Sequence, residues 1–214
     1  MITLLNIDCM EYMATLPDKA FDLAIVDPPY GINVGKMSQG KGGRRTGKHE
    51  RNYKKGDWDS KPPSGEYFSE LFRVSRDQII WGANYYPQYF TASPGWILWD
   101  KGQRLDQADG ELAYSSVKKP LRIWTQNRII LQQEGTIHPC QKPVKLYEWL
   151  LHNYAKPGQR ILDTHGGSMS SVIAAIKYKC DIVCCELDID YFNAGVERVN
   201  QFQKQSTLFD FEDD

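Results

Sequence analysis

Four consecutive residues, Asp27-Pro28-Pro29-Tyr30, carry the most informative chemistry in this sequence. They follow the apolar run of residues 21–26, which predicts a short buried strand. Two prolines remove two backbone N–H donors and fix two φ angles, so nearby carbonyls stay rigid and free to accept hydrogen bonds. A carboxylate, a rigid carbonyl and an aromatic ring suit a planar group that carries an NH₂. The simpler alternative is a turn after a strand, because Asp-Pro is common in turns.

A second pattern occupies the last third of the chain. The sequence predicts a strand, a glycine turn, a helix and a second strand in succession, over residues 160–163, 164–168, 169–178 and 181–185. Such a unit is typical of nucleotide binding, because the glycines let a ligand approach the backbone closely. Glu186 follows Gly166 by twenty residues, where an acid can hold ribose hydroxyls. Dinucleotide binding would also fit this half of the chain, although the full glycine fingerprint is absent.

Together the two patterns resemble the β class of S-adenosylmethionine-dependent amino-methyltransferases, in which the catalytic motif precedes the cofactor motif. Residues 27–30 resemble its catalytic motif, and residues 138–143 resemble its His-Pro-x-Gln-Lys-Pro segment. Residues 162–168 resemble its cofactor loop. Glu186 matches its ribose-binding acid, and Asp8 matches an acid on the adenine side of the cofactor. The resemblance implies a Rossmann-like α/β fold, with a mostly parallel sheet, helices on both faces and a circularly permuted motif order.

The resemblance also assigns roles to individual residues. The implied catalytic residues are Asp27, Pro28, Pro29 and Tyr30. For S-adenosylmethionine, the implied contacts are Asp8, Cys9, Asp27, Lys142, Asp163, His165, Gly166, Gly167, Ser168 and Glu186. The cofactor loop departs from the family pattern at two positions, since His165 stands where Phe is usual and Met169 where a second Gly is usual.

An acid in the first position of the catalytic motif implies methylation of adenine N6 in DNA, as in restriction-modification and phage methylases. Asp27 and the carbonyl of Pro28 would accept the two N–H hydrogens of the amine and localise its lone pair on nitrogen. Tyr30 would stack on a base flipped out of the duplex. Cytosine N4 methylation and an inactive DNA-binding relative remain alternatives. A nicotinamide-dependent oxidoreductase is a third.

Further elements must position these motifs. The sequence predicts strands over residues 2–6, 78–82, 96–99, 111–114 and 121–124. It predicts helices over residues 8–16, 64–74, 143–154 and 190–203. The chain of 214 residues suits one α/β domain, assigned to residues 1–204.

The charge of the chain is distributed unevenly. The net charge is −1, but residues 34–55 hold eight basic residues and one acid. We expect residues 31–57 to form a mobile basic loop that contacts the phosphates of double-stranded DNA. The residues assigned to DNA binding are Lys36, Lys41, Arg44, Arg45, Lys48 and Arg51.

Other features limit the class of protein. No apolar run approaches ~20 residues, so no membrane span is expected. The absence of a signal peptide and of a disulfide framework among five cysteines predicts a cytoplasmic protein of a bacterial or phage-infected cell, and no metal site is expected. A homodimer is compatible with the sequence.

The C-terminus suggests a further partner. Residues 205–214 are predicted to form an acidic tail after the last helix. Within it, Gln205, Leu208 and Phe209 resemble the peptide by which many bacterial DNA-processing proteins dock on the replication sliding clamp. The alternative is that the apolar residues of the tail fold back on the body.

Overall fold

The computed structural model of the chain describes residues 1–33, 59–102, 108–127, 130–131 and 135–210, with side chains as far as Gln205. The six basic residues that the sequence assigns to DNA binding lie outside the described residues. Residues 34–57 of the predicted basic loop lie outside them too.

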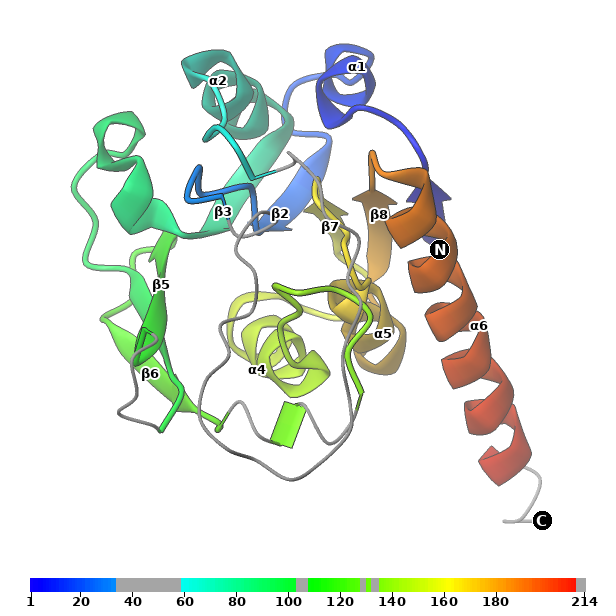
Figure 1. Ribbon diagram of the computed structural model, residues 1–214. Coiled ribbons are helices and arrows are strands. Elements are labelled where there is room, and N and C mark those ends of the chain that lie inside the picture. Colours follow the sequence, from blue (N-terminus) through cyan, green and yellow to red (C-terminus); the bar gives the residue numbers. More distant parts are fainter. Residues whose placement is uncertain (34–58, 103–107, 128–129, 132–134, 211–214) are drawn as a thin grey trace.

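An eight-stranded sheet forms the centre of the described part, in the order β1-β8-β7-β2-β3-β5-β4-β6 (Figure 1). The strands are Ile2–Leu5 (β1), Phe21–Val26 (β2), Ser75–Trp81 (β3), Trp96–Asp100 (β4), Gly110–Ser115 (β5), Arg122–Thr125 (β6), Arg160–Asp163 (β7) and Asp181–Cys185 (β8). All pairings between these strands are parallel except those of β5, which runs antiparallel to β3 and β4. The predicted mostly parallel α/β sheet is confirmed.

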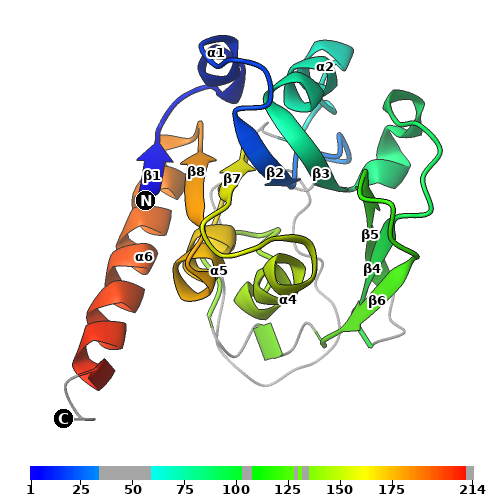
Figure 2. The ribbon, with the colours of Figure 1, turned by 180° about the vertical axis from the view of Figure 1, so that it is seen from behind.

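Helices cover both faces of the sheet. They are Cys9–Ala14 (α1), Gly65–Val74 (α2), Val144–Tyr154 (α4), Ser170–Tyr178 (α5) and Ile189–Asp210 (α6). Figures 1 and 2 show α1 and α2 on one side of the sheet and α4 and α5 on the other. Local signals start these helices where the sequence predicts, since Ser64 caps α2 through the N–H of Tyr67 and Pro143 occupies the N-cap of α4.

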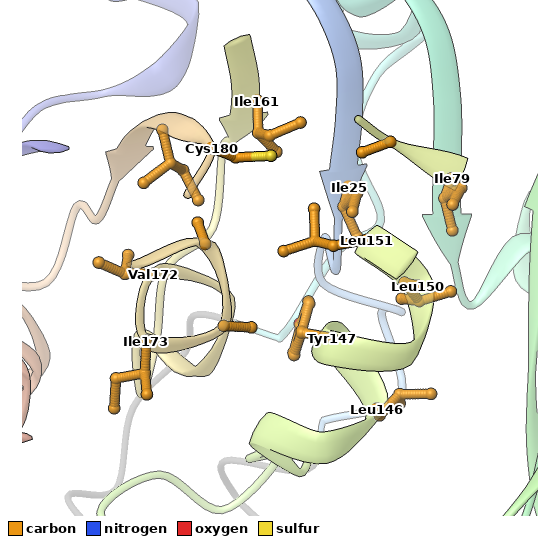
Figure 3. Packing of buried hydrophobic residues seen from close by; sticks show 14 of the residues in the cluster. Ile25, Ile79, Leu146, Tyr147, Leu150, Leu151, Ile161, Val172, Ile173 and Cys180 are labelled. Atoms are coloured by element: carbon orange, nitrogen blue, oxygen red, sulfur yellow. The ribbon is translucent and has the colours of Figure 1, made fainter. Parts of the chain in front are cut away.

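Two apolar cores follow from this layering. Strand β2 is buried on both faces, so its alternate side chains enter different cores. Leu23 and Ile25 pack with α4 and α5, whereas Ala24 and Val26 pack with α1 and α2. In Figure 3, Leu150 and Leu151 of α4 lie near Ile25. Burial on both sides explains why β2 reads as a continuous apolar run, and it fixes where the strand ends.

Two predicted boundaries differ from the structure by three residues or more. Strand β3 begins at Ser75, directly after α2, and not at Gln78. Helix α6 continues to Asp210, beyond the predicted end near Gln203, because residues 201–210 contain neither glycine nor proline to stop it. The predicted boundary between domain and tail therefore falls inside a helix, and Gln205, Leu208 and Phe209 lie within α6. None of the helices in the described residues is long and apolar enough to span a membrane.

Candidate active site

Four carboxylates lie at the carboxyl ends of four neighbouring strands. Asp8 follows β1, and Glu186 follows β8. Asp163 is the last residue of β7, and Asp27 follows β2. These strands are adjacent and parallel, so they all end at the same edge of the sheet. The two motifs, far apart in the sequence, thus meet where open α/β sheets bind their ligands.

Both oxygens of the Asp27 carboxylate are held by side chains. The Tyr30 hydroxyl donates to Oδ1 at 2.7 Å, and the Lys142 ammonium donates to Oδ2 at 2.5 Å. Lys142 Nζ also lies 3.0 Å from Glu111 Oε2, and Glu111 Oε1 lies 2.8 Å from Lys101 Nζ. The site therefore contains two acids and two lysines joined in one chain of ion pairs.

Burial and neighbouring charges shift the pKa values of this cluster. Burial raises the pKa of Asp27 and Glu111 adds to the shift, although Lys142 opposes it. Burial would also raise the pKa of Glu111, but Lys142 and Lys101 outweigh it and lower that pKa to about 2. Burial acts to lower the pKa of Lys142, yet Asp27 and Glu111 raise it above its ordinary value. Lys142 is consequently protonated, and Glu111 is ionised.

The ring of Tyr30 is held by the segment that follows β3. It stacks on Tyr85, with ring centroids 5.0 Å apart and an interplanar angle of 17°. Gly82 has a φ of 69°, and a Cβ at this position would stand 2.1 Å from Cε1 of Tyr30. Tyr85 is 43% exposed, so an aromatic surface continues from the catalytic motif to solvent.

The glycine turn after β7 is tied to Glu186 and Asp163. Glu186 accepts hydrogen bonds from the N–H groups of Gly167, at 2.7 Å, and Asp188, at 2.8 Å. Asp163 accepts from the N–H of His165 and the hydroxyl of Ser171, and burial raises its pKa to about 6. A Cβ at Gly166 would lie 2.5 Å from Sγ of Cys184, so the turn packs tightly on β8.

Comparisons with known proteins agree with this geometry. Residues 98–197 match the family model described as DNA methylase, N6_N4_Mtase. The matched range contains Glu111, Lys142, Asp163 and Glu186, whereas Asp27 lies before it. This stretch, slightly under half of the chain, is similar to DNA methylases. The predicted S-adenosylmethionine-dependent DNA methyltransferase is thereby confirmed.

Individual relatives of this DNA methylase extend the match. YubD of Escherichia coli (strain K12) is 24% identical over 212 residues, which cover 92% of this chain and 89% of YubD. The DNA adenine methyltransferase YhdJ of the same organism is 28% identical over 88 residues, 41% of this chain and 30% of YhdJ. The crystal structure of the M1.HpyAVI–SAM complex has the same fold, with a TM-score of 0.61 and 17% identity over 92% of this chain and all of that one.

The residues of the methylase fit S-adenosylmethionine, which carries an adenosine, a sulfonium and an amino acid group. Asp8, Asp163 and Glu186 supply carboxylates suited to ribose hydroxyls and to positive charge. Beside Glu186, the side chains of Leu187 and Ile189 are 69% and 50% exposed, an apolar surface suited to an adenine ring.

Other residues assigned to the cofactor have partners within the protein. Asp8 caps α1 by accepting from the N–H of Met10 at 2.8 Å. Burial raises the pKa of Cys9 to about 12, so its thiol stays protonated. The hydroxyl of Ser168 lies 3.1 Å from that of Ser170. Lys142, also assigned to the cofactor, places its ammonium on Asp27; its cofactor contact stays a prediction.

Sequence reasoning missed Glu111 and Lys101. Both lie at the ends of short apolar strands, where a charged residue normally faces solvent. Lys101 is instead 5% exposed. The sequence did contain a signal for Glu111. An acid at the start of an otherwise apolar strand indicates that a cation pairs with it.

Proposed function

We propose that this methylase transfers a methyl group from S-adenosylmethionine to N6 of adenine in double-stranded DNA. The observation that carries the proposal is the position of Asp27 and Tyr30 beside three further carboxylates at one edge of the sheet. An acid in the first position of the motif favours adenine, and YhdJ, which matches over part of its length, is named an adenine methyltransferase. The bound cofactor would supply an electrophilic methyl group.

The amine of adenine is a weak nucleophile because its lone pair is delocalised into the ring. Asp27 and the carbonyl of Pro28 would accept its two N–H hydrogens and draw the lone pair onto nitrogen. Tyr30, already stacked on Tyr85, would hold the face of the flipped base. Rate enhancement in this scheme comes from positioning and from polar groups fixed before the reaction. None of the cysteines is needed as a nucleophile.

Methylation of cytosine N4 is the second candidate, because the family model that matches the chain covers both amines by name. Cytosine and adenine each present an amine beside a ring nitrogen, so Asp27 could hold either. An inactive DNA-binding relative is the third. Three further points remain predictions from the sequence. They are the contacts between the basic residues and DNA, docking on a sliding clamp through Gln205, Leu208 and Phe209, and a homodimer.

The deciding experiment expresses the chain in bacteria that lack DNA methylation of their own. Mass spectrometry of the digested DNA measures N6-methyladenine and N4-methylcytosine, and sequencing gives their context. We expect N6-methyladenine, and none from an Asp27→Ala variant that still binds S-adenosylmethionine within about tenfold, ~1.4 kcal/mol. Methylcytosine would replace the proposal with its rival, and unchanged turnover by Asp27→Ala would overturn the role of Asp27.

A further inference from the structure

Glu111 lies in the active site without a part in the chemistry described above. We propose that Glu111 is a positioning residue, which keeps hold of the Lys142 ammonium when the target amine binds Asp27 and weakens its pair with Lys142; this assignment rests on the proposed function. Glu111 and Lys142 are joined at 3.0 Å, and their side chains are 23% and 2% exposed.

The occupied hydrogen bonds show why such a residue is needed. An ammonium has three N–H donors. Those of Lys142 have three partners within reach, which are Asp27 Oδ2 at 2.5 Å, Glu111 Oε2 at 3.0 Å and the Tyr30 hydroxyl at 3.2 Å. Since Tyr30 also occupies Oδ1 of Asp27, each carboxylate oxygen already accepts one strong hydrogen bond, and a new amine must compete with these donors. The target amine would therefore share Asp27 with Lys142, and the pair between Lys142 and Asp27 weakens when the amine binds.

Lys142 can leave Asp27 only if another acid remains beside it. A buried ammonium without a carboxylate is strongly destabilised, whereas one that keeps a single acid loses less. Glu111 supplies that acid on the same nitrogen. Its other oxygen is held by Lys101 at 2.8 Å, which fixes the direction of the carboxylate. Lys142 can thus shift toward Glu111 without leaving the protein interior.

The charge that develops during transfer gives Glu111 a second effect. When the lone pair of the amine forms its bond to the methyl carbon, the bond from that carbon to the donor sulfur would break with its electron pair going to sulfur. The nitrogen would then be positive until Asp27 or solvent takes one of its protons. A nearby ammonium opposes this charge, and a nearby carboxylate offsets the ammonium. With Glu111 ionised, the two acids and two lysines of the cluster sum to zero. Without it, the site would carry one excess positive charge.

The topology explains how Glu111 reaches this place. Strand β5 is antiparallel to β3 and β4, so its first residues lie at the edge where its neighbours end. Glu111 pairs with Trp99 in the register of β4 and β5, and Lys101 follows β4 directly. A parallel β5 would place the same glutamate at the opposite edge of the sheet.

The kinetic test compares Glu111→Gln with the wild type on DNA that carries the target site. We expect kcat to fall by at least about tenfold while KM for S-adenosylmethionine changes by less than about twofold, since Gln is isosteric and only the charge is lost. Adding Lys101→Met should restore much of kcat, because it removes the excess charge and frees the Gln oxygen for Lys142. Glu148→Gln, which breaks a surface pair with Lys177, is the matched control and should leave kcat unchanged.

An unchanged kcat in Glu111→Gln would overturn the proposal, as would a raised KM for S-adenosylmethionine with no recovery in the double variant. A stability cycle tests the shared lysine without any activity. Asp27→Asn and Glu111→Gln should lower Tm together by more than the sum of their separate effects, since Lys142 then has no acid. Additive shifts would show that the two acids do not share it. A wild type that methylates no DNA defeats the proposed function instead, whatever the cycle shows.

Discussion

The carboxylate of Asp59 holds the backbone of Tyr30 in place. Oδ1 of Asp59 accepts the N–H of Tyr30 at 2.7 Å and the N–H of Gly31 at 2.9 Å, and Asp59 is 2% exposed. In a planar trans peptide the N–H and the preceding C=O point in opposite directions, so this contact also directs the carbonyl of Pro29. An acid 29 residues away in the sequence thereby fixes the backbone of the catalytic motif.

Replacing Asp59 with Ala should reduce both stability and methyl transfer. It leaves two part-buried N–H groups without this acceptor, at a cost of about 1–3 kcal/mol for each. Asp59→Asn is the matched control, because both bonds go to one oxygen that an amide retains. Tm and kcat are to be measured for both variants. Equal losses in Asn and Ala would mean that the negative charge, and not the two hydrogen bonds, is what matters.

Gly82→Ala should displace Tyr30 and suppress methyl transfer while sparing cofactor binding. The new Cβ would stand 2.1 Å from the Tyr30 ring, and the positive φ adds about 1–2 kcal/mol of strain. Gly158→Ala separates the two effects, because Gly158 has a φ of 83° but nothing within 4 Å of an added Cβ. We expect similar strain in both variants and a loss of kcat only in Gly82→Ala. Equal kcat values would contradict the role of the Tyr30 contact.

Gly195→Ala should destabilise the protein although it lies in helix α6. Alanine in a helix normally gains roughly 0.5–1 kcal/mol over glycine. Here its Cβ would lie 2.8 Å from Cγ of the buried Met169, which sits in the left-handed region at φ 54° just before α5. Changing Met169 to Gly in the same chain should remove the collision and the strain together. Thermal unfolding and S-adenosylmethionine titration of the single and double variants check this, and a stable single variant would refute it.

His165→Phe should change how stability depends on pH. Burial lowers the pKa of His165 to about 4 from 6.5, so the unfolded chain takes up the proton first as the pH falls. The histidine's contribution is complete above pH 6.5 and is lost as the pH falls toward 4, by at most about 3 kcal/mol. The Phe variant should lack this loss. Urea unfolding at several pH values gives the difference between the two proteins, which should be constant above pH 7 and should change below it.

Neutralising Arg44, Arg45, Lys48 and Arg51 should weaken DNA binding and leave S-adenosylmethionine affinity unchanged. Each lost phosphate contact flattens the slope of log affinity against log salt by about 0.9. In a control variant, Lys156, Lys177 and Lys179 are neutralised instead. These lysines lie at or just after the C-terminal ends of α4 and α5, at the other edge of the sheet. Fluorescence anisotropy over a salt series measures both slopes. The same slope in the loop variant and the wild type would exclude these residues from DNA contact.

The sequence by itself determined the parallel half of the fold and the order of its motifs. Residues 21–26, 160–163 and 181–185 were predicted as strands with the observed bounds, because strands buried on both faces read as apolar runs between turn residues. Asp27, Asp163 and Glu186 then had to share an edge, since parallel strands end on the same side. The carboxylate edge of the active site was therefore accessible from local pattern alone.

Only the tertiary structure decided which side chains meet at Asp27. Lys142 is 115 residues away from Asp27 in the sequence. Asp59 is 29 residues away from Tyr30, and the composition of the segment between them does not predict that the two residues contact each other. Glu111 joins them because β5 is antiparallel to its neighbours. The alternation of side chains along an isolated strand does not predict the direction in which the strand will run. Local patterns report which face of an element is apolar. Contacts between distant charged side chains depend on register, strand direction and burial, which are set only when the whole sheet assembles.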